Sequence, residues 1–351
     1  MNNNIDWKNL GFHYTETDYM IRADYHNGSW TPARATRQKQ ITLHAAATCL
    51  QYGQEAFEGL KAVRGNDGII RLFRPEGNIK RLQSSAEGLY MAPVPEDLFM
   101  EAALMAVRMN LKYVPPTETG AVLYLRPLLI GTTPRLGVGP GKDFTFIILA
   151  SPIGPYYPVG FHGTPFIINR YVDRAAPLGI GQYKTGGNYA ASFRATEPAH
   201  EQGLSCLFLD SKYKKYIDEC GAANFFGIIK AEDADEEYND LSGYTYITPK
   251  STSILPSITN DSLRRLAKDM KMRVQCRHIA VSELAGMTEC AACGTASIVS
   301  PISKIIDPDE NRIYDFGEDP GPICTKLYNA LLDIQYGRMP DKYHWCTIIN
   351  Q

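Results

Sequence analysis

Residues 179–192 read Gly-Ile-Gly-Gln-Tyr-Lys-Thr-Gly-Gly-Asn-Tyr-Ala-Ala-Ser, which places Lys184 in a glycine-rich loop ahead of a run of small residues. Glycines on both sides of the lysine allow positive φ values and a close approach of the backbone to a ligand. A lysine that is held in such a loop and partly desolvated can act as a nucleophile or carry a proton. The segment alone is equally compatible with a surface lysine in a flexible loop.

Pyridoxal phosphate is one cofactor that uses such a lysine, and it needs three further partners: an acid for the pyridine nitrogen, a phenol for the ring oxygen and a phosphate cup. Glu219 follows an apolar run and offers the acid, and Tyr189 offers the phenol five residues after the lysine. Arg81 can hold a phosphate with two hydrogen bonds. The turns at residues 251–254 and 294–296 can add amides and hydroxyls. Each feature alone is also explained by a surface ion pair, a core tyrosine or an ordinary turn, but together they favour a cofactor site.

Residues 1–151 have the pattern of a first α/β domain. Apolar runs and helical periodicity predict, in order, strands at 20–25 and 68–73, helices from Pro75 to Ala86 and from Glu96 to Leu111, and strands at 121–130 and 144–150. Residues 152–164 then combine prolines and glycines at a density that no regular element tolerates, so they are predicted to form an interdomain linker loop.

Residues 165–351 have the pattern of a second, larger domain that mixes both element types. The predicted strands lie at 165–170, 206–209, 216–219, 225–229, 244–248, 272–279 and 297–302, and the predicted helices at 187–202, 261–269 and 323–336. Both halves together indicate an α+β fold class.

The composition argues against several functions. The chain has 36 Lys and Arg residues against 38 Asp and Glu residues, a net charge of −2, so the basic surplus of a nucleic-acid-binding protein is missing. No apolar run approaches the roughly 18 residues of a membrane-spanning helix, and the N-terminal residues lack a signal-peptide pattern. We therefore expect a cytoplasmic protein that binds neither nucleic acid nor membrane.

Eight cysteines are spread over the chain, and we expect them to be reduced. Cys290-Ala-Ala-Cys293 has the spacing of half a zinc site or of a redox pair, but no complementary half-site is present. Buried small residues beside a turn explain the pair more simply, so no metal site is expected.

In their order along the chain, the motifs resemble those of the branched-chain amino acid aminotransferases of the fold-type IV pyridoxal phosphate family. The matching stretches cover about residues 20–305 and are Phe57-Glu-Gly-Leu-Lys61, Arg71-Leu-Phe-Arg-Pro75 with Asn78 and Arg81, Leu123-Tyr-Leu-Arg-Pro127, Leu136-Gly-Val138, Gly181-Gln-Tyr-Lys184-Thr-Gly-Gly-Asn-Tyr189, Glu219 with Asn224, Ile254-Leu-Pro256 and Gly294-Thr-Ala296. The resemblance implies a two-domain α+β architecture of the D-amino acid aminotransferase type. It assigns residues 1–151 to a smaller N-terminal domain and 165–351 to a larger domain that binds pyridoxal 5'-phosphate.

The resemblance also implies the cofactor contacts. Lys184 would be the catalytic residue, forming the aldimine with pyridoxal 5'-phosphate and moving the proton between the substrate and the cofactor. The phosphate would be held by Arg81 and by the backbone at Ser253, Ile254 and Thr295. Tyr189 would contact the ring oxygen. Glu219, with Asn224 beside it, would contact the ring nitrogen.

The implied substrate site combines an apolar pocket with two positions for carboxylates. Phe57, Tyr124, Tyr156 and Ala222 would line the pocket for a branched side chain. The Thr295–Ala296 turn would bind the α-carboxylate, and Arg126 would receive the distal carboxylate of glutamate. Tyr52, Leu136 and Val138 would reach the site from a neighbouring subunit, so a homodimer with shared active sites is implied.

The implied reaction is a reversible ping-pong transfer of the amino group between L-leucine, L-isoleucine or L-valine and 2-oxoglutarate. Within the same fold, a D-amino acid or amine transaminase and an aminodeoxychorismate lyase remain alternatives. A non-catalytic relative and a lysine enzyme without cofactor are alternatives of other classes. The presence of Lys184 and Glu219 opposes the former, and Arg81 with the Thr295 turn opposes the latter.

Overall fold

The structure is a computed structural model that describes residues 5–7, 10–155 and 160–350. The chain divides into two compact units. Unit 1 comprises residues 1–158, 183–186 and 333–351, and unit 2 comprises residues 159–182 and 187–332. The predicted linker at 152–164 includes undescribed residues, and the predicted domain limits stay predictions.

Unit 1 is built on a nine-stranded sheet in which all pairings are antiparallel. The order along the sheet is β18 (Cys346–Ile349), β6 (Ile70–Phe73), β5 (Leu60–Arg64), β7 (Val122–Gly131), β8 (Phe144–Ile153), β1 (Met20–His26) and β2 (Ser29–Trp30), with β3 (Arg34–Thr36) on β1 and β4 (Glu55–Phe57) on β7. Residues 346–349 were predicted within the second domain, but they pair with β6 and extend the sheet of unit 1.

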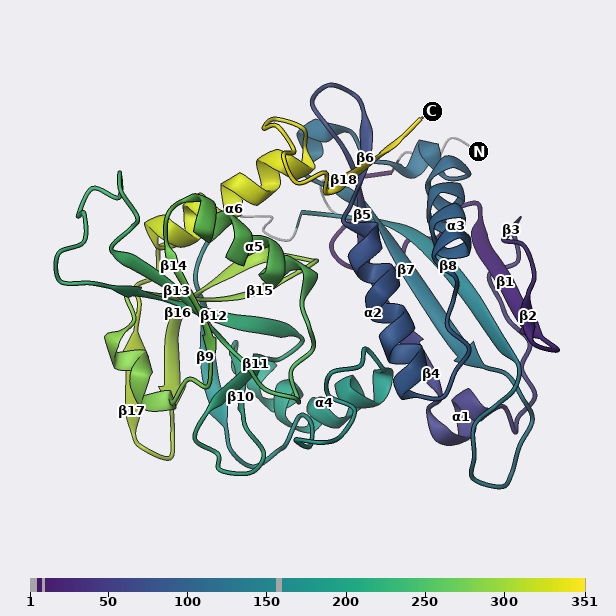
Figure 1. The fold of residues 1–351 in the computed structure, drawn as a ribbon, viewed down its shortest axis with the longest axis horizontal. Helices are drawn as coiled ribbons and strands as arrows, with labels where there is room; N and C mark the ends of the chain where they lie inside the picture. The colour runs from purple at the N-terminus through teal and green to yellow at the C-terminus, as the bar shows by residue number, and fades with distance from the viewer. Residues whose placement is uncertain (1–4, 8–9, 156–159, 351) are drawn as a thin grey trace. The chain divides into compact units, whose positions relative to one another are not determined.

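Two helices, α2 (Pro75–Gly88) and α3 (Glu96–Arg108), pack on this sheet in Figure 1. Pro75 occupies the first turn of α2, where its fixed φ suits a helix start. Acidic residues in the first turn of α3 and Arg108 in its last turn complement the helix dipole. Both predicted helices are confirmed. The prediction extended the second one to Leu111, but α3 ends at Arg108, and Leu111 begins a separate 3₁₀ turn, η1 (Leu111–Tyr113). Short elements that the patterns did not indicate include α1 (Thr48–Tyr52), β4, β5 and η2 (Thr117–Thr119).

Unit 2 contains a closed ring of six strands. The ring runs through β11 (Ile217–Cys220), β10 (Ser205–Leu209), β9 (Thr164–Asn169), β16 (Ile298–Asp307), β15 (Glu289–Gly294) and β12 (Ala223–Lys230), which pairs with β11 again. Phe166, Leu207 and Phe225 belong to the buried apolar cluster formed by its strands. Further strands are β13 (Tyr244–Pro249) and β14 (Arg273–Arg277), which follow β12 in the sheet, and β17 (Arg312–Asp315) on β16.

Three helices accompany these strands: α4 (Gly186–His200), α5 (Ile258–Asp269) and α6 (Pro322–Gln335). α5 begins three residues before the predicted Asp261 because the Ser257 hydroxyl caps it, accepting a hydrogen bond from the Asn260 N–H at 3.1 Å. β13 and β14 run parallel on either side of α5 in sequence, a βαβ unit. A 3₁₀ turn, η3 (Val281–Gly286), follows β14.

Cys290 and Cys293 lie buried in β15 with free thiols. Because they are three residues apart on a strand, their side chains leave opposite faces of the sheet. Burial raises the pKa of both thiols.

Within the described ranges, no group of three or more His, Cys, Asp or Glu side chains is arranged to hold a metal ion. None of the helices in the described part of the chain has the length and apolarity needed to cross a membrane.

Candidate active site

The Lys184 loop is fixed by hydrogen bonds on both sides of the lysine. The Lys184 N–H donates to the Ser85 Oγ of α2 at 3.0 Å, and the Lys184 carbonyl accepts from the Phe57 N–H at 3.0 Å. Residues 183–186 therefore pack as part of unit 1, although α4, which begins at Gly186, continues into unit 2. The backbone of the predicted nucleophile is thus not that of a flexible surface loop.

Glu55 anchors the residues that follow the lysine, a role that the sequence did not indicate. Its Oε1 accepts hydrogen bonds from the Gly186 N–H and from the Thr185 Oγ1, the latter at 3.1 Å. A side chain at position 186 would push this carboxylate out of its present position, so glycine allows the contact. Burial raises the pKa of Glu55, and these hydrogen bonds partly oppose that effect. A negative charge at the first residue of α4 is also favoured by the helix dipole.

Two cationic groups lie close to the Phe57 ring. The Lys184 Nζ is 4.5 Å from the ring centroid, and the Arg126 Cζ is 5.0 Å from it. Arg126 also lies 5.3 Å from the centroid of the Tyr124 ring and donates to the Tyr124 hydroxyl at 3.3 Å. Four of the predicted site residues are therefore neighbours in unit 1.

One feature of this cluster points to a ligand, and another fixes the position of an aromatic ring. The Arg126 Nε is buried and has no hydrogen-bond partner among the described residues, a cost that structures rarely leave uncompensated. The Tyr124 hydroxyl lies where a side chain at position 59 would be, so Gly59 is needed for the ring to approach β5. The cluster thus presents aromatic surface together with a buried donor that suits an anion.

Arg81 makes an ion pair that the sequence did not predict. Its Nε and Nη2 donate to the two carboxylate oxygens of Glu58, both at 2.7 Å, and Glu58 is fully buried. The Asn78 Nδ2 donates to the same carboxylate at 2.7 Å. This pairing fixes the guanidinium in position, and its contact with a phosphate stays a prediction.

Glu219 is the centre of a hydrogen-bond network within unit 2. Its Oε2 lies 2.8 Å from the Arg174 Nε, and its Oε1 accepts from the Leu255 N–H at 2.6 Å and from the Asn224 Nδ2 at 3.3 Å. Because the residue is buried, the arginine stabilises the charged carboxylate. Arg174 also donates to the Ser253 carbonyl at 2.6 Å. Asn224 and Ser253 were predicted here, whereas Arg174 was missed because it stands in no motif.

The remaining predicted residues of unit 2 lie in turns or on helix α4. Ser253 is buried and donates its hydroxyl to the Asp218 Oδ2 at 2.7 Å, and Ile254 is half-buried beside it. Thr295 and Ala296 occupy the half-exposed turn between β15 and β16. Tyr189 is half-buried on α4, and Ala222 is exposed between β11 and β12. No described contact tests the roles expected of them.

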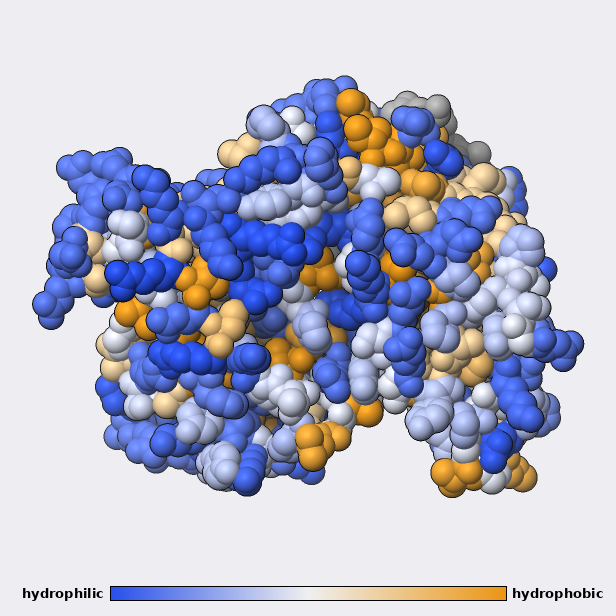
Figure 2. Space-filling model, viewed as in Figure 1, coloured by the Kyte–Doolittle hydropathy of each residue, from blue (hydrophilic) through white to orange (hydrophobic). Residues whose placement is uncertain are grey.

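Three residues expected at a subunit interface lie together on unit 1. The Tyr52 hydroxyl donates to the Leu136 carbonyl, and Leu136 and Val138 are 83% and 87% exposed. The region of α1 and of the β7–β8 connection shows apolar surface on the face drawn in Figure 2. Tyr156, the remaining predicted pocket residue, lies outside the described residues.

Comparison with known proteins gives matches over nearly the whole chain. The model of the class IV aminotransferase family matches residues 55–305. The branched-chain-amino-acid aminotransferase of Helicobacter pylori strain J99 is 44% identical over 346 residues, 97% of this chain and 97% of the relative. The enzyme of the same name from Haemophilus influenzae strain KW20 is 40% identical over 348 residues, 97% of this chain and 98% of the relative.

A solved structure agrees with these matches. The crystal structure of the Escherichia coli branched-chain amino acid aminotransferase aligns with a TM-score of 0.76 at 27% identity, covering 95% of this chain and 100% of that chain. The predicted α+β fold class is therefore confirmed.

Proposed function

Because the chain belongs to the class IV aminotransferase family, we propose that it transfers amino groups reversibly between L-leucine, L-isoleucine or L-valine and 2-oxoglutarate. The proposal is supported by relatives named branched-chain-amino-acid aminotransferase that are 44% and 40% identical over almost their whole length. The cofactor of the proposed reaction is pyridoxal 5'-phosphate.

The chain carries side chains with the chemistry that this cofactor requires. Lys184 offers an amine for covalent attachment, Tyr189 a phenol for the ring oxygen, and Glu219 a carboxylate for the pyridine nitrogen. The Glu219 carboxylate lies 2.8 Å from the Arg174 Nε, and a neighbouring cation favours the charged carboxylate that suits this role. When bound, pyridoxal phosphate supplies an electron-withdrawing ring that weakens the Cα–H bond of the substrate. Lys184 Nζ then takes that proton and later returns it.

The observation that carries the substrate proposal is that Lys184 and Arg126 both lie within about 5 Å of the centroid of the Phe57 ring. The aromatic rings of Phe57 and Tyr124 provide a surface for a branched aliphatic side chain. The buried Arg126 Nε, which has no partner among the described residues, is a donor for the distal carboxylate of glutamate or 2-oxoglutarate. One cluster therefore suits both substrates of a ping-pong cycle, in which each must occupy the site in turn.

The test is the absorbance spectrum of the purified protein with pyridoxal phosphate, recorded before and after addition of L-leucine. We expect a visible band that L-leucine bleaches and that 2-oxoglutarate restores. A band that ignores L-leucine but responds to D-alanine would keep the family and overturn the substrate. Absence of any band would overturn the proposed cofactor.

The proposed enzyme is a homodimer. Leu136 and Val138 are large apolar side chains that lie almost entirely in solvent in the single chain. Apolar side chains that project together in this way are typical of association surfaces. A symmetric dimer would cover the same surface on both copies.

A further inference from the structure

The segment that carries Lys184 is held at three points within unit 1. The Ser85 hydroxyl accepts the Lys184 N–H at 3.0 Å, and the Phe57 N–H donates to the Lys184 carbonyl at 3.0 Å. The third contact is made by Glu55, which binds the two residues after the lysine. It differs from the other two because an ionisable side chain makes it and because it spans two consecutive residues.

Glu55 fixes the chain directly after the lysine. A single carboxylate oxygen, Oε1, accepts hydrogen bonds from the Thr185 hydroxyl at 3.1 Å and from the Gly186 N–H. Thr185 is 1% exposed, and a Cβ at Gly186 would lie 2.6 Å from the same oxygen. Rotation of the backbone at either residue would break one of these bonds. The contact therefore restricts the direction in which the lysine side chain leaves the loop.

The strand that carries Glu55 also carries the aromatic ring beside the lysine amine. Glu55 and Phe57 are two residues apart on β4, so their side chains leave the same face of the strand. The Lys184 Nζ lies 4.5 Å from the centroid of the Phe57 ring. One face of β4 thus contacts the amine through Phe57 and the following residues through Glu55. A shift of the loop along β4 would change the position of the amine relative to the ring.

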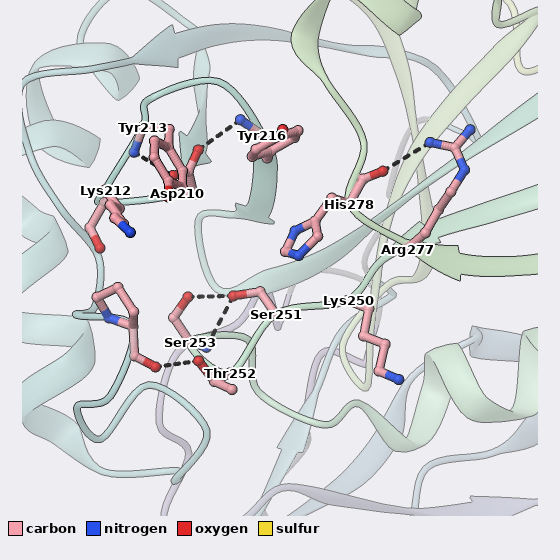
Figure 3. A pocket seen from close by; sticks show the side chains of 12 residues that line it. Asp210, Lys212, Tyr213, Tyr216, Lys250, Ser251, Thr252, Ser253, Arg277 and His278 are labelled. Carbon is pink, nitrogen blue, oxygen red and sulfur yellow. Dashed lines mark hydrogen bonds between the residues drawn. The ribbon is translucent and has the colours of Figure 1, made fainter.

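Other carboxylates of the chain that accept backbone N–H groups support local structure. Asp210 accepts the N–H groups of Tyr213 at 2.6 Å and of Tyr216 at 2.7 Å in the β10–β11 connection, as Figure 3 shows. Glu289, which is 6% exposed, accepts two N–H groups in the first turn of α6, at 2.9 and 2.7 Å. Such contacts stabilise turns and helix starts. Glu55 differs from them because the groups that it holds follow the proposed reactive lysine.

We propose that Glu55 is a positioning residue: through Thr185 and Gly186 it keeps the Lys184 amine where the substrate proton is taken up. This inference rests on the proposed function. Both bonds end at one oxygen, so the carbonyl oxygen of a glutamine at position 55, with its two lone pairs, can replace the carboxylate. An aspartate keeps the charge but is one methylene shorter, which withdraws the oxygen from the loop. The position of the oxygen, and not its charge, is the property that matters.

The test compares Glu55→Gln, Glu55→Asp and Glu289→Asp with the wild type, each saturated with pyridoxal phosphate. In Glu55→Asp, kcat for L-leucine with 2-oxoglutarate should fall by about tenfold to a hundredfold, because a displaced amine transfers the proton poorly. The KM for L-leucine should change by less than about twofold. In Glu55→Gln, kcat should stay within about threefold of the wild type. The control Glu289→Asp shortens another buried carboxylate by the same methylene and should keep the wild-type kcat.

Hydrogen–deuterium exchange of the same four proteins reports on the loop itself. In Glu55→Asp, the Gly186 amide should exchange about tenfold faster or more, because its acceptor has moved away. In Glu55→Gln, it should keep the wild-type rate. In Glu289→Asp, faster exchange should occur at residues 323–324 and not at Gly186. Thermal unfolding verifies that each variant is folded, and the Glu55→Gln comparison stands alone if the aspartate variant does not fold.

The contrary results are distinct. Wild-type kcat and exchange in Glu55→Asp would show that the contact does not position the lysine. A large loss of kcat in Glu55→Gln would make the charge essential and overturn the proposal. A higher KM in Glu55→Asp without a fall in kcat would assign Glu55 to substrate binding instead. A wild type without turnover refutes the proposed function together with this inference, whereas an active wild type beside an equally active Glu55→Asp refutes this inference alone.

Discussion

Lys184 and Phe57 are joined twice: their backbones share a 3.0 Å hydrogen bond, and the lysine Nζ lies 4.5 Å from the centroid of the phenyl ring. The backbone bond positions the loop, and the ring limits the space open to the amine. The residue that would react and the residue that would contact the substrate side chain are therefore fixed relative to each other within unit 1.

Replacement of Lys184 by alanine should abolish transamination and leave the fold intact. The amine is the proposed carrier of the Cα proton, and we expect turnover of L-leucine with 2-oxoglutarate to fall by about 10³-fold or more. Circular dichroism melting should stay close to that of the wild type. Lys80→Ala, which removes an exposed lysine on α2, is the matched control and should retain full activity. Substantial turnover by Lys184→Ala would refute the proposed mechanism.

Arg126→Ala should discriminate between the two oxo acids. Loss of a charge-assisted contact to the distal carboxylate should raise the KM for 2-oxoglutarate by about tenfold to a hundredfold. The KM for 2-oxoisocaproate, which has no distal carboxylate, should change much less. Steady-state kinetics with both oxo acids on one preparation provides the comparison. Equal losses for both would remove the role assigned to Arg126.

Glu58→Gln should destabilise the protein strongly. The substitution leaves the Arg81 guanidinium, on a side chain that is only 10% exposed, without its counter-charge, and loss of one partner of a buried pair typically costs about 3–5 kcal/mol. Asp67→Asn breaks the more exposed pair with Arg71, at 2.6 Å, and should cost less than about 1 kcal/mol. Urea unfolding of both variants measures the difference. Similar costs for the two would show that the buried pair is not a main support of unit 1.

The stability contributed by Lys61 should depend on pH. Burial lowers the pKa of Lys61 to about 7, whereas in the unfolded chain the pKa is about 10.4. The unfolded chain therefore binds the proton more tightly, and the folded state loses stability as the pH falls from about 10 to 7. Lys61→Met should be more stable than the wild type at pH 7 by about 2 kcal/mol or more, and this advantage should shrink by pH 9.5. Urea unfolding at both pH values tests this, and an advantage that grows with pH would contradict it.

Aspartate at positions 136 and 138 should dissociate the proposed homodimer. Charges in place of Leu136 and Val138 would have to be desolvated at the interface, which opposes association. Size-exclusion chromatography with light scattering should give a monomer for the double variant and a dimer for the wild type. Leu178→Asp alters a leucine of unit 2 that is 95% exposed and should remain dimeric. A monomeric wild type would end the dimer proposal.

The sequence predicted most elements that depend on local pattern. The long strands β7 and β8 and the helices α2 and α3 have apolar periodicity over ten or more residues, and they were found within a few residues of the prediction. The motifs also led to Lys184, Phe57, Tyr124 and Arg126, which the fold brings together in unit 1.

Partners distant in sequence could not be predicted in this way. Glu55 supports a loop that lies about 130 residues later, and nothing near position 55 shows that this carboxylate will bond to the Gly186 N–H. Arg174 and Glu219 stand in different segments, and only the folded chain shows their ion pair. β18 pairs with β6, a strand from the first quarter of the chain, and short-range periodicity does not indicate which strands will pair.

The pairing of β18 with β6 sets an order in which the chain is completed during synthesis. Unit 1 takes residues from three separate segments, and residues 346–349 leave the ribosome only after all of unit 2 has been made. Until then one edge of β6 has no neighbour, and an unpaired strand edge is a site where other chains can add. Unit 2 is thus the first unit for which every residue has been synthesised, and the sheet that begins near residue 20 is the last to close. The free edge of β6 is therefore a site of aggregation that lasts until the final residues of unit 1 are made.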